Sequence, residues 1–152
     1  MKLKIAVISA AILFFASVSA VPAQPWKGWR GSEGWGMGGQ YQRMFDPAKV
    51  EKISGEVAGI EQVTPMRGMH YGVVLMVKTE KEAVPVHLGP SWYIERLDTK
   101  FNTGDKVEVT GARTTFQGKP AIIAAEIRKD DQVLVLRDRN GVPVWAGWGR
   151  RR

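Results

Sequence analysis

Hydrophobic and polar positions alternate with a period of two along much of the chain between residues 50 and 137, a pattern typical of β-strands. Glycine-containing or charged segments interrupt the alternation and predict turns. The predicted strands cover residues 52–63, 71–80, 83–89, 102–112, 121–129 and 132–138. An Asn-Gly pair at 140–141, followed by Val-Pro-Val-Trp, predicts a terminal hairpin.

The period changes over residues 89–101, where Tyr93, Ile94 and Leu97 fall on one helical side and Pro90 suits a first helical turn. Three strands, a short helix and then two or more strands is the element order of an OB-type barrel. We therefore predict a mainly β fold: a small OB-like Greek-key barrel of five to six strands with one short helix between strands three and four.

The first twenty residues combine two lysines, a short apolar run and small residues, which is the layout of a secretory signal peptide. The apolar run is shorter than the roughly 20 residues that a membrane-spanning helix needs. We expect residues 1–20 to be a cleaved signal peptide, with Ala20 as the preferred cleavage position and Ala23 as the second. The mature protein is then expected in the periplasm or another extracytoplasmic compartment.

Two segments flanking the predicted barrel are rich in glycine and tryptophan. Residues 21–47 are expected to form a flexible arm, residues 48–148 the OB-like domain with its terminal hairpin, and residues 149–152 a basic tail. The pattern W-x-G-W occurs at 26–29 and again at 145–148. Indole rings beside arginines suit an anionic membrane or a partner protein. Alternatively, the tail aromatics fold back over the barrel and close its open edge.

Composition narrows the possible chemistry. The chain has 22 Lys and Arg and 15 Asp and Glu, so loss of Lys2 and Lys4 with the signal peptide leaves 20 − 15, a charge of +5. This modest excess suits an anionic partner, although it also serves solubility. The absence of cysteine excludes disulfides, thiolate metal sites, thiol catalysis and C-x-x-C-H haem attachment. An exported domain without disulfides must be held together by its own core.

Four stretches of the chain, "PVHLGPSWYIE", "GDKVEVTG", "GKPAIIAAEI" and "LRDRNGVPVWAGW", resemble the C-terminal domain shared by the magnetosome-associated proteins MamS and MamX and their exported relatives. The likeness covers roughly residues 48–148 and rests on strand and turn patterns. It implies an extracytoplasmic protein linked to metal or redox physiology. Relatives of the MamX type carry C-x-x-C-H haem motifs, which this chain lacks, so an electron-transfer role does not carry over.

The stretch "TPMRGMHYG", residues 64–72, contains a candidate metal site. Met66, Met69 and His70 offer two thioethers and an imidazole, which suit Cu(I), and His87 could join them from the third strand. However, proline and glycine are ordinary turn residues, and methionine beside an aromatic ring usually packs. The first interpretation is a structured turn and the second is a copper site, with no other cofactor implied.

The third predicted strand places His87 on its outward face, opposite Val84, Val86 and Leu88. His87 is interpreted first as a partly buried histidine hydrogen-bonded near the helix start. The alternative is a ligand or pH-sensitive group in a pocket with Trp92 and Tyr93. These two aromatics are themselves expected to be core residues that close the barrel through the helix, or else an exposed stacking platform. The residues considered for a ligand or partner surface are Tyr71, Trp92, Tyr93, Trp145, Trp148 and Arg150.

Three classes of function are compatible with these features. The preferred one is an exported, non-catalytic binding or accessory module whose partner is a protein of the cell envelope or an anionic membrane surface. A barrel with basic charge would also allow single-stranded nucleic-acid binding, but export argues against a ligand that is scarce outside the cytoplasm. A periplasmic Cu(I)-binding protein is the third. Catalysis is not expected, because no Ser-His-Asp order, paired-histidine metal motif or phosphate-binding loop occurs.

Overall fold

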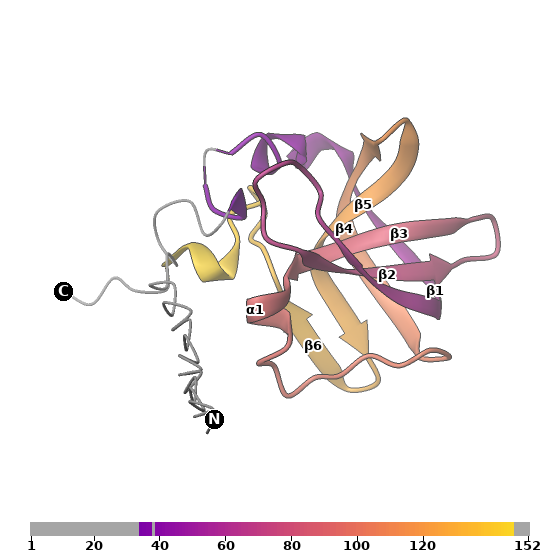
Figure 1. Ribbon diagram of the computed structural model, residues 1–152. Coiled ribbons are helices and arrows are strands. Elements are labelled where there is room, and N and C mark those ends of the chain that lie inside the picture. The colour runs from indigo at the N-terminus through magenta and orange to yellow at the C-terminus, as the bar shows by residue number, and fades with distance from the viewer. Residues whose placement is uncertain (1–33, 38, 148–152) are drawn as a thin grey trace, which may run out of the picture.

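Six strands form one sheet whose pairing runs β3-β2-β1-β4-β5-β6 in the computed structural model, which describes residues 34–37 and 39–147 (Figure 1). The strands are β1 (Val50–Val63), β2 (Gly72–Lys78), β3 (Ala83–Pro90), β4 (Lys106–Phe116), β5 (Lys119–Lys129) and β6 (Gln132–Val135). All neighbours in this order are antiparallel. The predicted mainly β fold, with a helix between the third and fourth strands, is confirmed.

The helical elements are short. The helix α1 (Ser91–Ile94) follows β3 directly, and the described residues include the 3-10 helices η2 (Gln42–Met44), η3 (Pro47–Lys49) and η4 (Val144–Gly147). The sequence predicted a helix within residues 89–101, but α1 has a single turn because the chain tightens after Ile94. There, Arg96 and Leu97 donate to carbonyls three residues back, a 3-10 pattern. None of the helices in the described ranges is long and apolar enough to cross a membrane.

A long first strand allows the sheet to curl. The N-terminal half of β1, Val50 to Glu56, pairs with β4, and its C-terminal half, Glu56 to Val63, pairs with β2. The register shifts between Val57 and Gly59, as in a β-bulge, which bends a strand and increases its twist. The two edges of the curled sheet can therefore approach each other.

The ring of hydrogen-bonded strands closes where β3 pairs with β5. This pairing is parallel and joins only Val86 with Ile122 and His87 with Ile123. Arg137, which follows β6, extends the seam with its side chain: Nη1 donates to the carbonyl oxygen of Leu88 at 3.0 Å and to that of Ala124 at 2.5 Å. One guanidinium thus binds both strands immediately beyond their last paired residues.

The core fills the interior of the ring with aliphatic side chains from every long strand. Strand β2 contributes Val73, Leu75 and Val77, and Tyr93 and Ile94 of α1 pack against the same cluster. Because alternate residues of β3 also enter it, the inward placement of Val84, Val86 and Leu88 is as predicted. The domain is held by this apolar burial, as expected of a chain without disulfides.

Segments from both ends of the chain join this core. Trp35, Tyr41 and Phe45 precede β1 and are buried, and Trp145 in η4 is completely buried. The indole Nε1 of Trp145 donates to the carbonyl oxygen of Trp35 at 2.8 Å. In Figure 1 the indigo segment before β1 and the yellow segment after β6 meet at one end of the strands. Residues 34–47, assigned from the sequence to a flexible arm, therefore supply aromatic side chains to the core.

The predicted terminal hairpin is reduced to a single bridge between Arg137 and Pro143. The intervening turn is closed by the Asp138 carboxylate, which accepts from the backbone N–H groups of Asn140 at 2.8 Å and Val142 at 2.9 Å. The chain then enters η4 instead of a second strand. This path carries Trp145 back onto the sheet.

Candidate functional site

The loop between β1 and β2 contains three of the four candidate metal ligands. Met66 and Met69 are half-buried and pack against the core. The backbone N–H of Met69 donates to the carbonyl oxygen of Met66 at 3.1 Å, and Gly68 between them has a φ of 85°, which favours glycine. Both thioethers are therefore used in packing within an ordinary turn.

The segment before β1 fixes this loop in place. Trp35 Nε1 donates to the carbonyl oxygen of His70 at 2.8 Å, and the His70 ring stacks on Tyr71 with centroids 4.3 Å apart. A Cβ atom on Gly34 would overlap the side chain of Met69. The loop thus forms part of the interface between the body of the domain and the segment that precedes it.

His87, the fourth candidate ligand, lies elsewhere. It pairs across the sheet with Val74, four residues beyond His70, and its side chain is only 2% exposed. Its side chain lies on the face opposite Val86, as predicted, but it is enclosed there and not only partly buried, because Tyr41 and Phe116 cover this face with ring centroids 6.0 and 4.9 Å from the imidazole. Burial, with the nearby charge of Arg137, lowers the pKa of His87 to about 4.

The four predicted metal ligands do not form a single cluster. Met66, Met69 and His70 share a loop, whereas His87 is enclosed by aromatic rings on β3. Within the described part of the chain, no group of three or more His, Asp or Glu side chains is arranged to hold a metal.

The aromatic residues considered for a partner surface have different surroundings. Tyr71 is 37% exposed, and Trp92 is half-buried against the core. Tyr93 is buried and contacts Trp145 at 5.2 Å between ring centroids. Trp145, with no exposed surface, cannot offer its indole to a partner. Trp148 and Arg150 lie outside the described residues.

We call Trp35, Tyr41, Phe45 and Trp145 the aromatic cover. Trp35 lies where a side chain on Gly72 of β2 would be, and Trp145 occupies the equivalent space at Gly89 of β3. Either glycine would clash with an indole if it carried a Cβ atom. OB folds commonly bind ligands on the face of strands two and three and on the loop between strands one and two. Here the aromatic cover occupies part of that face, and Trp35 holds the loop in place through its hydrogen bond to the carbonyl oxygen of His70.

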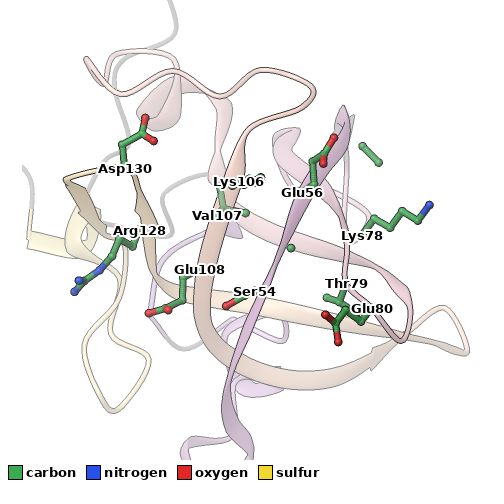
Figure 2. A pocket seen from close by; sticks show the side chains of 12 residues that line it. Ser54, Glu56, Lys78, Thr79, Glu80, Lys106, Val107, Glu108, Arg128 and Asp130 are labelled. Carbon is green, nitrogen blue, oxygen red and sulfur yellow. The ribbon is translucent and has the colours of Figure 1, made fainter.

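An open groove lies elsewhere, on residues of β1, β4, β5 and the turn after β2 (Figure 2). Its volume is about 810 Å³, and its lining includes the small residues Ser54, Gly55 and Ala58. Figure 2 shows Lys78 and Glu80 on one side of the groove and Arg128 and Asp130 on the other. Sequence reasoning missed this groove because most of its residues, taken alone, occupy ordinary solvent-facing positions of a strand or turn.

Charges of both signs line the groove. Glu56 of β1 stands in register with Lys78 on one neighbouring strand and with Lys106 on the other. The cations are Lys78, Lys106 and Arg128, and the carboxylates are Glu56, Glu80, Glu108 and Asp130, so three positive minus four negative charges leaves −1. None of the three cations forms an ion pair with another described residue. A near-neutral lining suits a polar segment with both signs of charge better than a polyanion.

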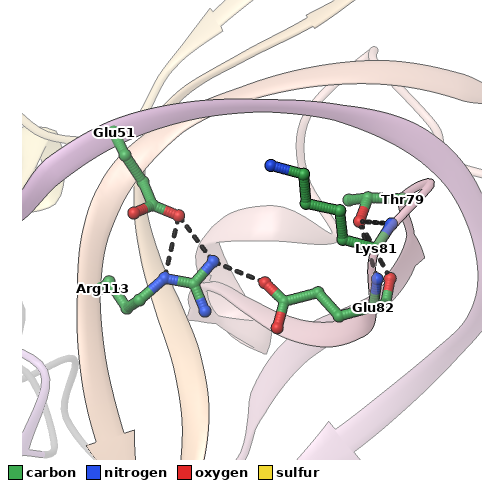
Figure 3. A network of polar contacts seen from close by, with 5 residues as sticks. All are labelled: Glu51, Thr79, Lys81, Glu82 and Arg113. Carbon is green, nitrogen blue, oxygen red and sulfur yellow. Dashed lines mark hydrogen bonds and ion pairs between the residues drawn. The ribbon is translucent and has the colours of Figure 1, made fainter.

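A separate ionic network ties the β2–β3 turn to the sheet (Figure 3). Arg113 of β4 donates through Nε and Nη2 to Glu51 Oε1 at 2.9 and 2.6 Å, and through Nη2 to Glu82 Oε1 at 2.6 Å. Thr79 closes the turn, since its hydroxyl accepts from the backbone N–H of Glu82 at 3.1 Å. The bonds to both carboxylates raise the pKa of Arg113, so it stays charged.

Replacing Arg113 with glutamine should lower the free energy of unfolding by about 0.5–1 kcal/mol, because these side chains are about one-third exposed and solvent screens the network. Urea denaturation in low salt and in about 1 M salt measures this effect, which should shrink in high salt. Lys119→Gln, at an exposed position at the start of β5, is the control. A loss that does not depend on salt would contradict an electrostatic role.

Comparison with known proteins identifies the family. Residues 49–134 match the MamS/MamX magnetosome protein family, which is more than half of the chain. The chain belongs to this family. None of the curated proteins compared with it gives a match.

The groove lies within the segment that matches the family, and the aromatic cover lies outside it. Every residue that lines the groove lies between Ser54 and Asp130, within the segment that matches MamS/MamX. By contrast, the aromatic cover and Arg137 lie outside it. The groove is therefore a feature of the MamS/MamX segment itself, and the aromatic cover is built from the flanking sequence.

Proposed function

We propose that this chain is an exported, non-catalytic accessory module of the MamS/MamX family, and that its groove binds a protein partner in the cell envelope. The observation that carries the proposal is the contrast between the two faces. The aromatic cover fills part of the face on which OB folds commonly bind ligands. The groove across β1, β4 and β5 is open, and its cations form no ion pair with any described residue.

The charge pattern favours a protein segment as the occupant. Lys106 and Arg128 can pair with carboxylates of a partner, and Glu56 and Asp130 can pair with its lysines or arginines. Complementary charges of both signs fix the register of a partner and exclude wrong partners. A nucleic acid would meet four carboxylates in the same groove, which disfavours that alternative.

A non-catalytic role agrees with the use of the histidines. His87, one of two in the chain, is enclosed by Tyr41 and Phe116 and kept neutral, so it cannot exchange protons with a bound substrate. His70 is held in the β1–β2 loop by its stacking on Tyr71. The Cu(I) alternative rests on this loop, and it requires the double variant Met69→Ala, His70→Ala to remove any rise in melting temperature caused by Cu(I).

Photo-crosslinking in cells tests the proposed groove. A photoreactive amino acid at Ser54 in the groove should give a defined crosslinked protein, whereas the same group at Lys119 should not. The double variant Lys106→Glu, Arg128→Glu should reduce the yield of this crosslink about tenfold, because like charges across an interface cost several kcal/mol. Lys119→Glu, which changes one charge at an exposed site, should leave the yield unchanged.

Two results would contradict the proposal. Equal crosslinking from Ser54 and Lys119 would mean that the groove has no specific partner. Binding to anionic vesicles that is lost in the Lys106→Glu, Arg128→Glu variant, without any protein crosslink, would instead assign the groove to a membrane surface.

A further inference from the structure

Three buried polar side chains from distant parts of the sequence meet beneath the aromatic cover. Tyr41 precedes β1, His87 lies in β3 and Arg137 follows β6, and none of the three is more than 3% exposed. The rings of Tyr41 and His87 stack with centroids 6.0 Å apart and an angle of 25° between planes. The charge of Arg137 acts on both residues and opposes protonation of His87.

Arg137 carries a buried positive charge that has no counter-ion among residues 34–37 and 39–147. Its Nη1 donates to the carbonyl oxygens of Leu88 and Ala124, and its Cζ lies 5.0 Å from the centre of the Trp145 ring. It forms no ion pair with any carboxylate in the described ranges. Buried charges in proteins are almost always paired, because removing an ion from water costs several kcal/mol.

Each of the three side chains also has a buried polar atom without a hydrogen-bond partner: Nε of Arg137, the hydroxyl oxygen of Tyr41 and Nδ1 of His87. Buried polar atoms without a partner are rare. Three of them occur here on side chains that stack on each other or feel the same charge, which points to a shared ligand. Tyr41 cannot supply the negative charge, since burial raises its pKa and keeps the hydroxyl protonated.

We propose that Tyr41, His87 and Arg137 bind a small monovalent anion of halide size. The Nε–H of Arg137 and the hydroxyl of Tyr41 would donate to it, as would Nδ1 of His87 in the tautomer that carries a proton there. All three atoms are enclosed, which favours a small ion over a phosphate or an organic acid. The ion neutralises Arg137 and links the segment before β1, strand β3 and the segment after β6.

Thermal unfolding in bromide tests the site. At constant ionic strength, replacing sodium gluconate with sodium bromide should raise the melting temperature along a saturating curve. Tyr41→Phe keeps the ring but removes one donor, so it should weaken the apparent bromide affinity about tenfold, the effect of losing a hydrogen bond to a charged group. Tyr71→Phe, at an exposed tyrosine, should bind bromide like the unaltered protein.

Crystals of the unaltered full chain grown in bromide provide a second measurement. It does not depend on how a substitution affects folding. An anomalous-scattering peak should lie between Arg137 Nε, the Tyr41 hydroxyl and His87 Nδ1. A peak of water density without anomalous signal would overturn the proposal and leave a buried water as the partner of these atoms. A melting temperature that responds to bromide equally in Tyr41→Phe and in the unaltered protein would also overturn it.

Discussion

Replacing Arg137 with methionine is expected to lower the free energy of unfolding by about 2–4 kcal/mol. The substitution keeps much of the aliphatic stem but removes both hydrogen bonds from Nη1 to the carbonyl oxygens of Leu88 and Ala124. A hydrogen bond from a charged group contributes about 1.5–3 kcal/mol, and the removal of a buried charge offsets part of this loss. Urea denaturation of the purified protein measures the change.

The control is Arg139→Met, which removes the same charge two residues away from an exposed position. Its expected effect is within about 0.5 kcal/mol, as for most surface substitutions. Arg137→Lys should fall between the two, since an ammonium group can donate to both carbonyls but lacks the planar guanidinium that lies over Trp145. If Arg137→Met and Arg139→Met were equally stable, the ring would not depend on this side chain at its seam.

The reason for a large effect is the weakness of the seam itself. Between β3 and β5 only two residue pairs form the parallel ladder, whereas β4 and β5 share ten. A register shift in β5 accompanies the closure: Ala125 has no partner on β4, and its carbonyl oxygen accepts from the backbone N–H groups of Leu136 and Arg137. The bulge thereby brings Arg137 to the seam that its side chain then bridges.

The strands could be predicted from the sequence because one physical signal, the alternation of apolar and polar residues, repeats over many positions. The strand predicted at 83–89 is Ala83–Pro90, and the one predicted at 121–129 is Lys119–Lys129. Errors at the ends follow local chemistry. Strand β6 was predicted to end at residue 138 but ends at Val135. It is shorter because the backbone N–H groups of Leu136 and Arg137 donate to the carbonyl oxygen of Ala125, after which the chain enters the Asp138 turn.

The aromatic cover could not be predicted in this way because it has no period. Trp35, Tyr41 and Phe45 are separated by glycines, methionines and polar residues, and each occupies a place that the tertiary structure alone creates. The same reason explains why the full burial of His87 was not predicted. Alternation correctly placed its side chain opposite Val86, but could not show that Tyr41 and Phe116 would cover that side. The burial of Arg137 could not be predicted from the sequence either, because arginine side chains are usually exposed to solvent.

The residues whose burial was not predicted and the open groove lie on different parts of the domain, which suggests different roles for them. Flanking segments close one face of the MamS/MamX segment with aromatic side chains and a buried cation, which makes that face part of the core. The groove on β1, β4 and β5 keeps its charges in solvent. Substitutions in the aromatic cover should therefore act on stability, and substitutions in the groove on binding.

Acidification is expected to destabilise the protein through His87. In the unfolded chain this imidazole has its ordinary pKa near 6.5, and in the folded protein burial and Arg137 lower the pKa to about 4. Below pH 6.5 the unfolded state takes up a proton that the folded state does not, so stability falls by about 1.4 kcal/mol for each pH unit. Between pH 6.5 and 4 the expected loss is about 3 kcal/mol, and none arises from this group above pH 7.

Urea denaturation between pH 7.5 and 4 in halide-free buffer measures this slope, since a bound halide would favour protonation of His87 and reduce the loss. His87→Phe should flatten the pH dependence whatever its own stability, because the proton-binding group is absent and the ring still fits between Tyr41 and Phe116. His70→Phe, which changes the histidine of the β1–β2 loop, should retain the full slope. Asp105 adds a smaller loss at the acid end of this window: its hydrogen bonds from Lys129 and Asn102 lower its pKa, so its stabilising effect begins to fall below about pH 5, when the unfolded carboxylate takes up protons. This loss is the same in the unaltered protein and in both variants. If His87→Phe and the unaltered protein lost stability in parallel, His87 would not be the group that responds to acid.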